Sequence, residues 1–504
     1  MTIEEIYGLT AGGIATDSRG DVEGKLFIPI VGENFDGHDY IESALNRGAA
    51  YALTERGGNE RLNERIINER LIKVESTRQT LIGLASYSRS LFTGPVTAIT
   101  GSAGKTTTKE MIASVLSQRF NTLKTKGNFN NDIGLPLTLL GRKDSHEAMV
   151  LEMGMNHRGE ISVLSKIGKP DICLITNIGD AHIENLGSRE GILQAKSEIF
   201  EGMREGGTVV LNGDDPLLAG LPPVPHAGKT IYCYNEGTPA PFQIEHDFIK
   251  PGDQVLRDSE GKALRYYANS GGNMEILSHS YYAVSDGEEA DSPRAGNWIQ
   301  ASMIGRRGLR GTSCTISWHI EGIPGWSEGS TNVEIPIPGD HMIMNAMMAF
   351  AVGIELGMSP LEIFVGIKSF TPPGHRMSIT EANGITIIND AYNASPSSMK
   401  AAIDMLETVK GRKVCILGDM FELGDFAPAM HKEVGEYAAE KSDLLISIGT
   451  LSKHMGAARH FATKEDFLSQ WKNHLHLGDT VLIKASRGMA LETVVEYMNK
   501  HQNG

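Results

Sequence analysis

The alternation of short apolar runs with helix-patterned segments constrains the fold of this chain most. The apolar runs lie at residues 95–100, 147–154, 171–179 and 207–215, and the helical patterns between them at 107–120 and 189–200. Parallel strands need long crossover connections, which helices of this length supply. The pattern therefore predicts an α/β domain built on a parallel sheet.

A second alternation begins near residue 373. Its apolar runs lie at residues 384–392, 412–420, 443–449 and 479–488, with a helix expected from Ser397. This pattern predicts a Rossmann-like domain. The first part of the chain has only short apolar stretches around a turn-rich segment. Since 504 residues exceed one ordinary core, we expect three domains, at 1–94, 95–372 and 373–504.

The regular alternation is lost between Asn212 and Gly339. Residues 269–297 are rich in Gly, Ser and acidic residues, a composition typical of exposed connections. We therefore expect a variable excursion from the central domain near 235–335. Shortening the 269–297 stretch is expected to affect activity little.

Composition excludes several classes of protein. A formal net charge of -15 argues against a nucleic-acid-binding surface, which needs clustered positive charge. The four cysteines are far apart, without zinc-type spacing, which favours a reducing compartment. The chain starts without a basic and apolar leader, and no run approaches the ~18 apolar residues of a membrane helix. We expect a cytoplasmic protein without membrane insertion.

The segment "ITGSAGKTTTKEMIASVLSQRF", residues 99–120, places a glycine-rich turn between a strand and a helix. Backbone N–H groups at such a helix start favour phosphate. Gly101 and Gly104 allow a tight turn, Lys105 can reach the β- and γ-phosphates, and Thr106 can ligate Mg²⁺.

This segment departs from the general phosphate-loop pattern, because Ile99 stands where the first glycine is usual. A glycine turn followed by a threonine-capped helix is the alternative. The lysine and threonine in register after Gly104 favour phosphate binding. The helix is expected to begin at Thr107.

Three ionic residues follow the predicted phosphate loop. Glu152 ends an apolar strand, His182 follows another strand, and Lys196 lies in a helix. A single histidine or helix lysine is more often a structural or solvated residue than a catalytic one. Their order after a phosphate loop favours an ATP and magnesium site, because carboxylate oxygens suit Mg²⁺.

Five segments resemble the Mur ligases, the ADP-forming amide ligases of peptidoglycan synthesis: "TGSAGKTTT", "GNFNNDIGLP", "LEMGMNHRGEI", "NIGDAHIENLGS" and "AKSEIF". Four more, "TDSR", "GENFDGHDY", "NDAYNASPSSMKAAID" and "ILGDMFELG", are similar to the member that joins D-alanyl-D-alanine to UDP-N-acetylmuramoyl-tripeptide. The resemblance implies three α/β domains, with a central sheet of the P-loop ATPase kind and a C-terminal Rossmann-like domain that receives the amine substrate.

The resemblance also implies roles for residues. Catalysis falls to Lys105, Lys196, His182 and Glu152. ATP would be bound by Gly101, Ser102, Ala103, Gly104, Lys105, Thr106, Thr107, Asn345, Arg376 and Asp390. The UDP substrate would contact Asp17, Ser18, Arg19, Asn34, Phe35, His38, Asn130 and Asn131. The dipeptide side would comprise Tyr392, Asn393, Ser486 and Arg487. Mg²⁺ would be held by Thr106, Glu152, His182 and Lys196, the last as a carbamate made from CO₂.

A carbamate forms only from a neutral amine, so Lys196 is expected in a site shielded from water that lowers its pKa. The apolar residues Ile192, Leu193, Ile199 and Phe200 can anchor its helix in the core.

Three positions depart from the family pattern. Met342 and Ser395 replace asparagines, and Ala485 replaces a glycine. Met342 and its neighbouring methionines are expected to fill the core. Two alternatives remain: a related ADP-forming ligase, such as a paralogue or a folylpolyglutamate-type enzyme, and a nucleotide-binding regulator without turnover. The four predicted catalytic residues favour an active ligase. A monomer is expected.

Overall fold

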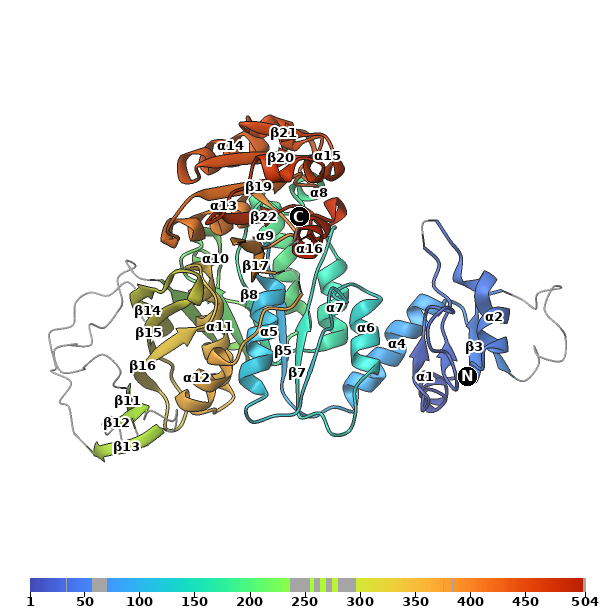
Figure 1. Ribbon diagram of the computed structural model, residues 1–504. Helices are drawn as coiled ribbons and strands as arrows, with labels where there is room; N and C mark the ends of the chain where they lie inside the picture. Colours follow the sequence, from blue (N-terminus) through green and yellow to red (C-terminus); the bar gives the residue numbers. More distant parts are fainter. Residues whose placement is uncertain are drawn as a thin grey trace.

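The chain forms three β-sheets in successive parts of the sequence. Figure 1 shows the N-terminal part beside the central part and the C-terminal part stacked on the central part. This arrangement confirms the predicted three-domain α/β fold. The computed structural model describes the backbone of residues 1–32, 34–56, 70–235, 254–257, 263–268, 274–279, 296–374, 376–382 and 384–501.

The N-terminal part is a small parallel sheet in the order β1-β2-β3-β4. A long helix, α4 (Thr77–Ser90), leads from it into the central part and contacts helices of both. The other elements are α1 (Ile3–Gly8), β1 (Ile14–Ala15), β2 (Leu26–Phe27), η1 (Gly37–Tyr40), α2 (Ile41–Asn46), β3 (Tyr51–Thr54) and β4 (Leu71–Lys73).

The central sheet has twelve strands in the order β13-β12-β11-β16-β15-β14-β10-β9-β8-β5-β7-β6. From β6 to β14 neighbouring strands are parallel. The strands β5 and β7 are buried at every position, as expected where helices cover both faces. The parallel strands are β5 (Val96–Thr100), β6 (Thr122–Lys124), β7 (Ala148–Glu152), β8 (Ile172–Ile175), β9 (Gly207–Asn212), β10 (Ala227–Tyr234) and β14 (Asn297–Arg306).

The helices that accompany these strands are α5 (Lys105–Leu116), α6 (Gly134–Leu140), α7 (Glu160–Gly168), α8 (Ile183–Leu186), α9 (Arg189–Ser197), η2 (Glu198–Gly202) and α10 (Pro216–Ala219). Both helical segments predicted from the alternation are present. Both end earlier than predicted: α5 ends at Leu116, and α9 ends at Ser197, where a 3₁₀ turn begins.

The last part of the excursion expected near 235–335 consists of regular strands. Strands β14, β15 (Thr312–His319) and β16 (Glu328–Ile335) form an antiparallel extension of the central sheet. Their buried polar side chains disguise the strand pattern but bond across the ladder, as Thr315 Oγ1 does to Asn332 Oδ1 at 2.8 Å. Farther out lie β11 (Gln254–Arg257), β12 (Ala263–Ala268) and β13 (Met274–His279). The rest of 269–295 lies outside the described residues.

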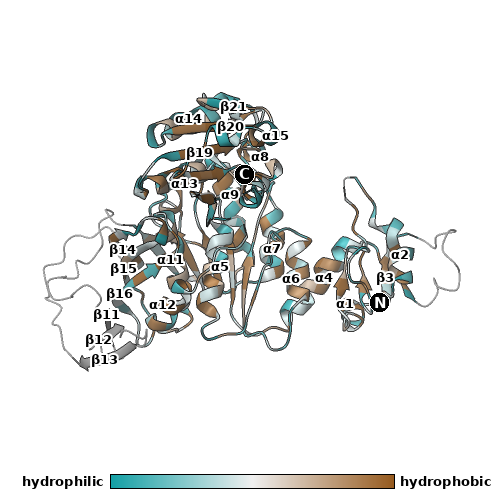
Figure 2. Ribbon diagram, viewed as in Figure 1, coloured by the Kyte–Doolittle hydropathy of each residue, from teal (hydrophilic) through white to brown (hydrophobic). Residues whose placement is uncertain are grey.

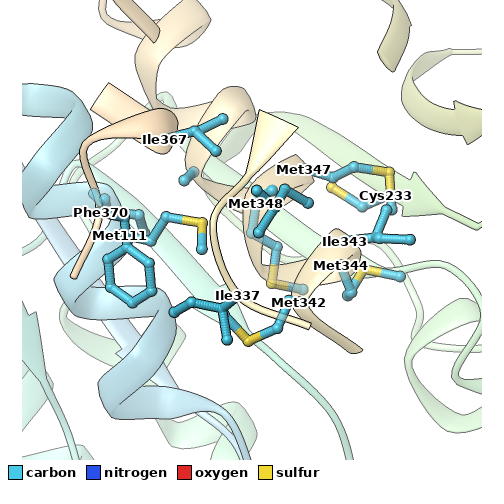
Figure 3. Packing of buried hydrophobic residues seen from close by; sticks show 14 of the residues in the cluster. Met111, Cys233, Ile337, Met342, Ile343, Met344, Met347, Met348, Ile367 and Phe370 are labelled. Carbon is cyan, nitrogen blue, oxygen red and sulfur yellow. The ribbon is translucent and has the colours of Figure 1, made fainter. Parts of the chain in front are cut away.

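Helix α11 (His341–Glu355) is buried along most of its length and belongs to the largest core cluster of the described residues. It contacts α5 and α12 (Pro360–Lys368). Figure 3 shows its methionines packed with residues of neighbouring elements. Met342 is 1% exposed, which confirms that it fills the core.

The C-terminal sheet has the order β17-β18-β22-β19-β20-β21, with only the β17–β18 pair antiparallel. Figure 2 shows hydrophobic colour along the inner strands of this and the central part. Within the described ranges no helix is both long and apolar enough to cross a membrane. The elements are β17 (Ser378–Ala382), β18 (Ile385–Asn389), α13 (Pro396–Asp404), η5 (Met405–Thr408), β19 (Lys413–Gly418), η6 (Gly424–Phe426), α14 (Ala427–Lys441), β20 (Leu444–Ile448), η7 (Ser452–Met455), β21 (Arg459–Phe461), α15 (Lys464–Leu468), η8 (Trp471–Asn473), β22 (Thr480–Lys484), η9 (Arg487–Met489) and α16 (Glu492–Lys500).

Candidate active site at the ends of the central strands

The predicted phosphate loop is a tight turn between β5 and α5. Gly101 and Gly104 have φ of 151° and 81°, in the region that favours glycine. A Cβ at Gly101 would lie 1.9 Å from Thr176 Oγ1, so the turn also needs glycine for space. The helix begins at Lys105, not at Thr107 as predicted, because the left-handed Gly104 is its N-cap.

The segment after β8 holds the loop in shape. Ser102 Oγ accepts from the Gly179 N–H at 2.8 Å, and the Ala103 N–H donates to Asn177 Oδ1 at 2.9 Å. Thr176 Oγ1 donates to the Ala103 carbonyl at 2.6 Å. Sequence reasoning missed Thr176 and Asn177, since their role appears only when the two strand ends meet.

Lys105 bends back over the loop. Its Nζ donates to the Gly101 carbonyl at 2.7 Å. Burial lowers the pKa of Lys105, and the charge of Glu152 opposes that shift. This lysine therefore lies against the glycine-rich turn that the sequence predicts to be a phosphate loop.

Glu152, at the end of β7, is 2% exposed and surrounded by polar groups. Its Oε1 accepts from Thr106 Oγ1 and from Asn130 Nδ2, both at 3.0 Å. Its Oε2 is buried without a hydrogen-bond partner and lies 3.4 Å from the Nζ of Lys109. Hydroxyl and carboxylate oxygens brought together in this way suit Mg²⁺.

Lys109 was missed by sequence reasoning, because a helix lysine usually faces solvent. Here it is fully buried, and its Nζ donates to the Thr125 carbonyl at 2.7 Å. Thr125 Oγ1 accepts from the Glu152 N–H at 3.0 Å. The two residues thus fix the backbone and the charge of Glu152.

Lys196 is 1% exposed within α9. Burial holds its pKa well below the usual range, and the charge of Lys105 lowers it further. Among the described residues no carboxylate forms an ion pair with it. The site therefore favours the neutral amine.

His182 lies near a carboxylate of the C-terminal part. Its Nδ1 is 2.8 Å from Glu422 Oε2. The pKa of Glu422 is below its usual value, mainly because of His182 and to a smaller extent because of the charge of Lys105. No cluster of three or more His, Cys, Asp or Glu suited to a metal occurs in the described part of the chain. Of the four predicted magnesium ligands, Thr106 and Glu152 are thus hydrogen-bonded to each other, whereas His182 contacts Glu422.

Helix α11 brings Asn345 to the start of α5. Asn345 Oδ1 accepts from Thr108 Oγ1 at 3.0 Å and would lie 3.3 Å from a Cβ at Gly104. Asn345 Nδ2 is 3.5 Å from the sulfur of Met342. The predicted nucleotide-side asparagine is therefore adjacent to the phosphate loop, and Met342 packs behind it.

Three of the C-terminal residues predicted from the sequence stack together. The Arg376 guanidinium lies 3.7 Å from the centre of the Tyr392 ring, and that of Arg487 lies 5.2 Å from it. Both arginines therefore make cation–π contacts with one ring.

Lys484, which sequence reasoning missed, contacts two further residues predicted from the sequence, Asp390 and Asn393. Its Nζ pairs with Asp390 Oδ2 at 2.5 Å and donates to the Asn393 carbonyl at 2.9 Å. Ser486 is 3% exposed, and its Oγ accepts from the Phe421 N–H at 2.9 Å. The hydroxyl of Ser486 thus holds a backbone segment of its own chain.

The predicted UDP-side residues of the N-terminal part divide between surface and interior. Asp17 and Arg19 pair at 2.9 Å on the surface, and Arg19 lowers the pKa of Asp17 to about 2. Ser18 is buried, and its carbonyl accepts from Arg47.

His38 is buried with both ring nitrogens engaged. Nδ1 lies 2.7 Å from Asp36 Oδ1, and Nε2 accepts from the Glu55 N–H at 3.2 Å. Asn34 and Phe35 are exposed on the preceding turn. His38 therefore supports this turn, and the exposed pair is accessible to a ligand.

Asn131 supports the junction between the N-terminal and central parts. Its Oδ1 accepts from the Gly134 N–H at 2.8 Å, at the start of α6. The adjacent Asp132 forms an ion pair with Arg78 of α4. The loop that carries Asn130 to Glu152 is thereby tied to the N-terminal part.

Comparisons with known proteins give the family. Three family models match: "Mur ligase family, catalytic domain" at residues 10–89, "Mur ligase middle domain" at 99–276 and "Mur ligase, glutamate ligase domain" at 375–487. The UDP-N-acetylmuramoyl-tripeptide--D-alanyl-D-alanine ligase of Bacillus subtilis (strain 168) is 37% identical, over 96% of this chain and 92% of that protein.

Solved structures are similar to this chain over nearly its whole length. MurF from Acinetobacter baumannii matches with a TM-score of 0.76 and 29% identity, over 97% of this chain and 93% of that one. MurF ligase from Thermotoga maritima, in complex with ADP, matches with a TM-score of 0.73 and 25% identity, over 97% of both chains. Similarity of this extent covers all three sheets, and the chain therefore belongs to the Mur ligase family.

Proposed function

We propose that this chain is an ATP-dependent, ADP-forming ligase that joins D-alanyl-D-alanine to UDP-N-acetylmuramoyl-tripeptide, a step of peptidoglycan precursor synthesis. The observation that carries the proposal is the 37% identity, over nearly the whole chain, to a relative named for that reaction. A folylpolyglutamate-type activity would need a different substrate site, whereas the similarity to ligases of the dipeptide extends through the N-terminal part and the C-terminal part.

The chemistry needs an activated carboxylate, because a free carboxylate does not expel oxide at neutral pH. Transfer of the γ-phosphoryl group of ATP to the tripeptide carboxylate releases ADP and gives an acyl phosphate. The amine of the dipeptide, after losing a proton, attacks the acyl carbon. The C–O bond to phosphate breaks, and inorganic phosphate leaves as the amide forms.

The phosphate loop supplies the positive field for the first step. Backbone N–H groups at the start of α5 face the turn formed by Gly101 and Gly104, and Lys105 lies above that turn. These groups offset the charge of the transferring phosphoryl group. Because an acyl phosphate hydrolyses, the C-terminal part is expected to close over the central part and exclude water.

Magnesium fits the residues around Glu152. The buried Oε2 of Glu152 has no hydrogen-bond partner, and the Thr106 hydroxyl is 3.0 Å from Oε1. Thr106 and Glu152, with His182 from the segment after β8, would hold the ion. When bound, Mg²⁺ would offset the negative charge of the ATP phosphates.

We also propose that Lys196 carries a carbamate. The neutral amine that its burial favours adds to CO₂, forming an N–C bond and releasing a proton. The product is an anionic oxygen donor in place of a cation, and such a donor suits Mg²⁺.

We place the reaction in the cytoplasm and expect a monomer. All four cysteines are free and buried, in keeping with a reducing compartment. Every residue assigned above belongs to one chain. Light scattering of the purified protein tests the monomer, and a mass of two chains would contradict it.

The amine specificity tests the proposed function. Pentapeptide should form from UDP-N-acetylmuramoyl-tripeptide and ATP with D-alanyl-D-alanine, and neither single amino acids nor L-glutamate should support turnover. Robust turnover with L-glutamate instead of the dipeptide would move the chain to another ligase activity.

A further inference from the structure

A carboxylate of the C-terminal part reaches the phosphate-loop end of the central part. Glu422 follows β19, in a segment (residues 419–424) that we call the Glu422 loop. Its Oε2 lies 2.8 Å from His182 Nδ1, although Glu422 follows a strand of the C-terminal sheet and His182 follows a strand of the central sheet. Both residues have φ of 64°. Such conformations are costly for residues other than glycine and cluster at functional sites.

The base of the Glu422 loop is fixed to the predicted dipeptide side. The Phe421 N–H donates to Ser486 Oγ at 2.9 Å, and the Ser486 N–H donates to the Asp419 carbonyl at 3.0 Å. Asp419 is buried, and its carboxylate accepts from the Ser452 N–H at 2.7 Å. The loop therefore presents Glu422 between the residues expected to receive the dipeptide and those expected to bind phosphate.

The tip of the loop packs on the central part. A Cβ at Gly424 would lie 3.0 Å from the side chain of Glu184, in α8. The end of the Glu422 loop therefore lies against α8, the helix that follows His182. The side chain of Glu422 is 55% exposed, so its carboxylate is accessible to a ligand.

The charges around Glu422 leave room for a cation. In the part of the chain that the structure describes, His182 alone lies within ion-pair distance, and it faces Oε2. Lys105 acts on the carboxylate only through its longer-range field. The phosphates of ATP would repel a carboxylate here, so a ligand that binds beside them must bring positive charge.

The amine substrate of the proposed reaction brings that charge. A dipeptide amine is an ammonium ion near neutral pH, and its nitrogen must reach the acyl carbon beside the phosphate loop. We propose that Glu422 binds the ammonium group of the amine substrate and so positions its nitrogen at the junction of the central and C-terminal parts. The assignment rests on the proposed function and adds a residue that recognises the amine end of the dipeptide.

The test compares a charged ligand with a neutral one in two proteins. Pentapeptide formation is measured in wild type and in Glu422→Gln, with D-alanyl-D-alanine as substrate. D-lactyl-D-alanine, in which a hydroxyl replaces the amine, serves as the competitor. Glu422→Gln should raise the KM for the dipeptide about tenfold or more, the scale of a lost charge-assisted hydrogen bond. The KM for ATP and the inhibition constant of the neutral analogue should not change.

Two further variants separate the charge from the structure of the loop. Asp425→Asn removes a charge from the neighbouring exposed position and should leave the KM for the dipeptide as in wild type. Glu422→Asp keeps the charge and should retain the preference for ammonium over hydroxyl. Equal weakening of both ligands by Glu422→Gln, or no weakening, would overturn the assignment. Wild type that makes no pentapeptide would instead overturn the proposed function.

Discussion

Burial sets the charge of the two lysines that the site depends on. Lys105 and Lys196 both have lowered pKa values, with removal from water as the largest cause in each case. Lys105 still has the carboxylate of Glu152 in its field, whereas Lys196 has only the repulsion of Lys105. The first is therefore suited to remain a cation beside phosphate, and the second to react as a neutral amine.

Lys105→Ala is predicted to lower turnover about a hundredfold or more, as loss of one preorganised donor to a transition state does. The fold should survive, since the side chain bonds only to the loop backbone. Steady-state kinetics and a melting curve measure the two effects. Lys166→Ala, an exposed lysine of α7, is the control. Turnover of Lys105→Ala close to wild type would contradict the phosphate-loop assignment.

Lys196→Ala is predicted to be nearly inactive and to regain part of its activity with added formate or acetate. The small carboxylate would occupy the place of the carbamate oxygens. Rates measured with and without the added anion test this, with Lys105→Ala as a variant that carboxylates should not rescue. Full activity of Lys196→Ala in CO₂-depleted buffer would refute the carbamate.

At the scale of elements, one buried arginine joins α4 to the end of α7. Arg89 is 1% exposed and donates to the carbonyls of Gly168, Phe92 and Lys169 at 2.6, 2.9 and 2.8 Å. Burial lowers its pKa to about 10. The bonds to Gly168 and Lys169 satisfy carbonyls at the end of α7, and the bond to Phe92 satisfies a carbonyl just after α4.

Arg89→Met is predicted to cost about 2–4 kcal/mol of stability, because it leaves buried carbonyls without donors. The melting temperature should fall accordingly. Arg204→Met is a matched control, since Arg204 is partly exposed and pairs with Asp171, near which Arg89 also lies. Equal melting temperatures for Arg89→Met and wild type would show that the three bonds contribute little.

Helix α11 gives a second prediction at this scale. Met342→Asn restores the residue that the family pattern has, but it places an amide in the methionine core of Figure 3. A loss of about 1–3 kcal/mol is expected from burying that amide. Met303→Asn, at an exposed position, should be nearly neutral. An unchanged melting temperature with a lower KM for ATP would instead make position 342 a nucleotide contact.

The helices and strands of the central site could be predicted from local sequence patterns. The contacts between residues distant in sequence could not. The strand, turn and helix around Lys105 could be predicted because glycine spacing and helical periodicity are local. Strands β15 and β16 could not, since their buried Ser and Thr are satisfied only across the ladder. Lys109 has the sequence pattern of a solvated helix residue, because its neighbour Glu152 lies on β7, far away in the sequence.

At the scale of the whole molecule, residues distant in sequence meet where the three parts join. Asn130 ties the N-terminal junction to Glu152, and Glu422 brings the C-terminal part to His182. The contact between Glu422 and His182 was not predictable, because no local pattern records which loops face each other across two sheets. Such a layout suits a reaction in which a nucleotide, an acyl donor and an amine must meet.

The coupling of ADP release to pentapeptide formation tests the central claim most directly. Purified protein is incubated with ATP, Mg²⁺ and UDP-N-acetylmuramoyl-tripeptide, with and without D-alanyl-D-alanine, and both products are quantified by mass spectrometry. The account predicts one ADP for each UDP-N-acetylmuramoyl-pentapeptide and little ADP without the dipeptide, because the acyl phosphate is protected from water. Equal ADP release without the dipeptide, or ADP release without pentapeptide, would contradict it.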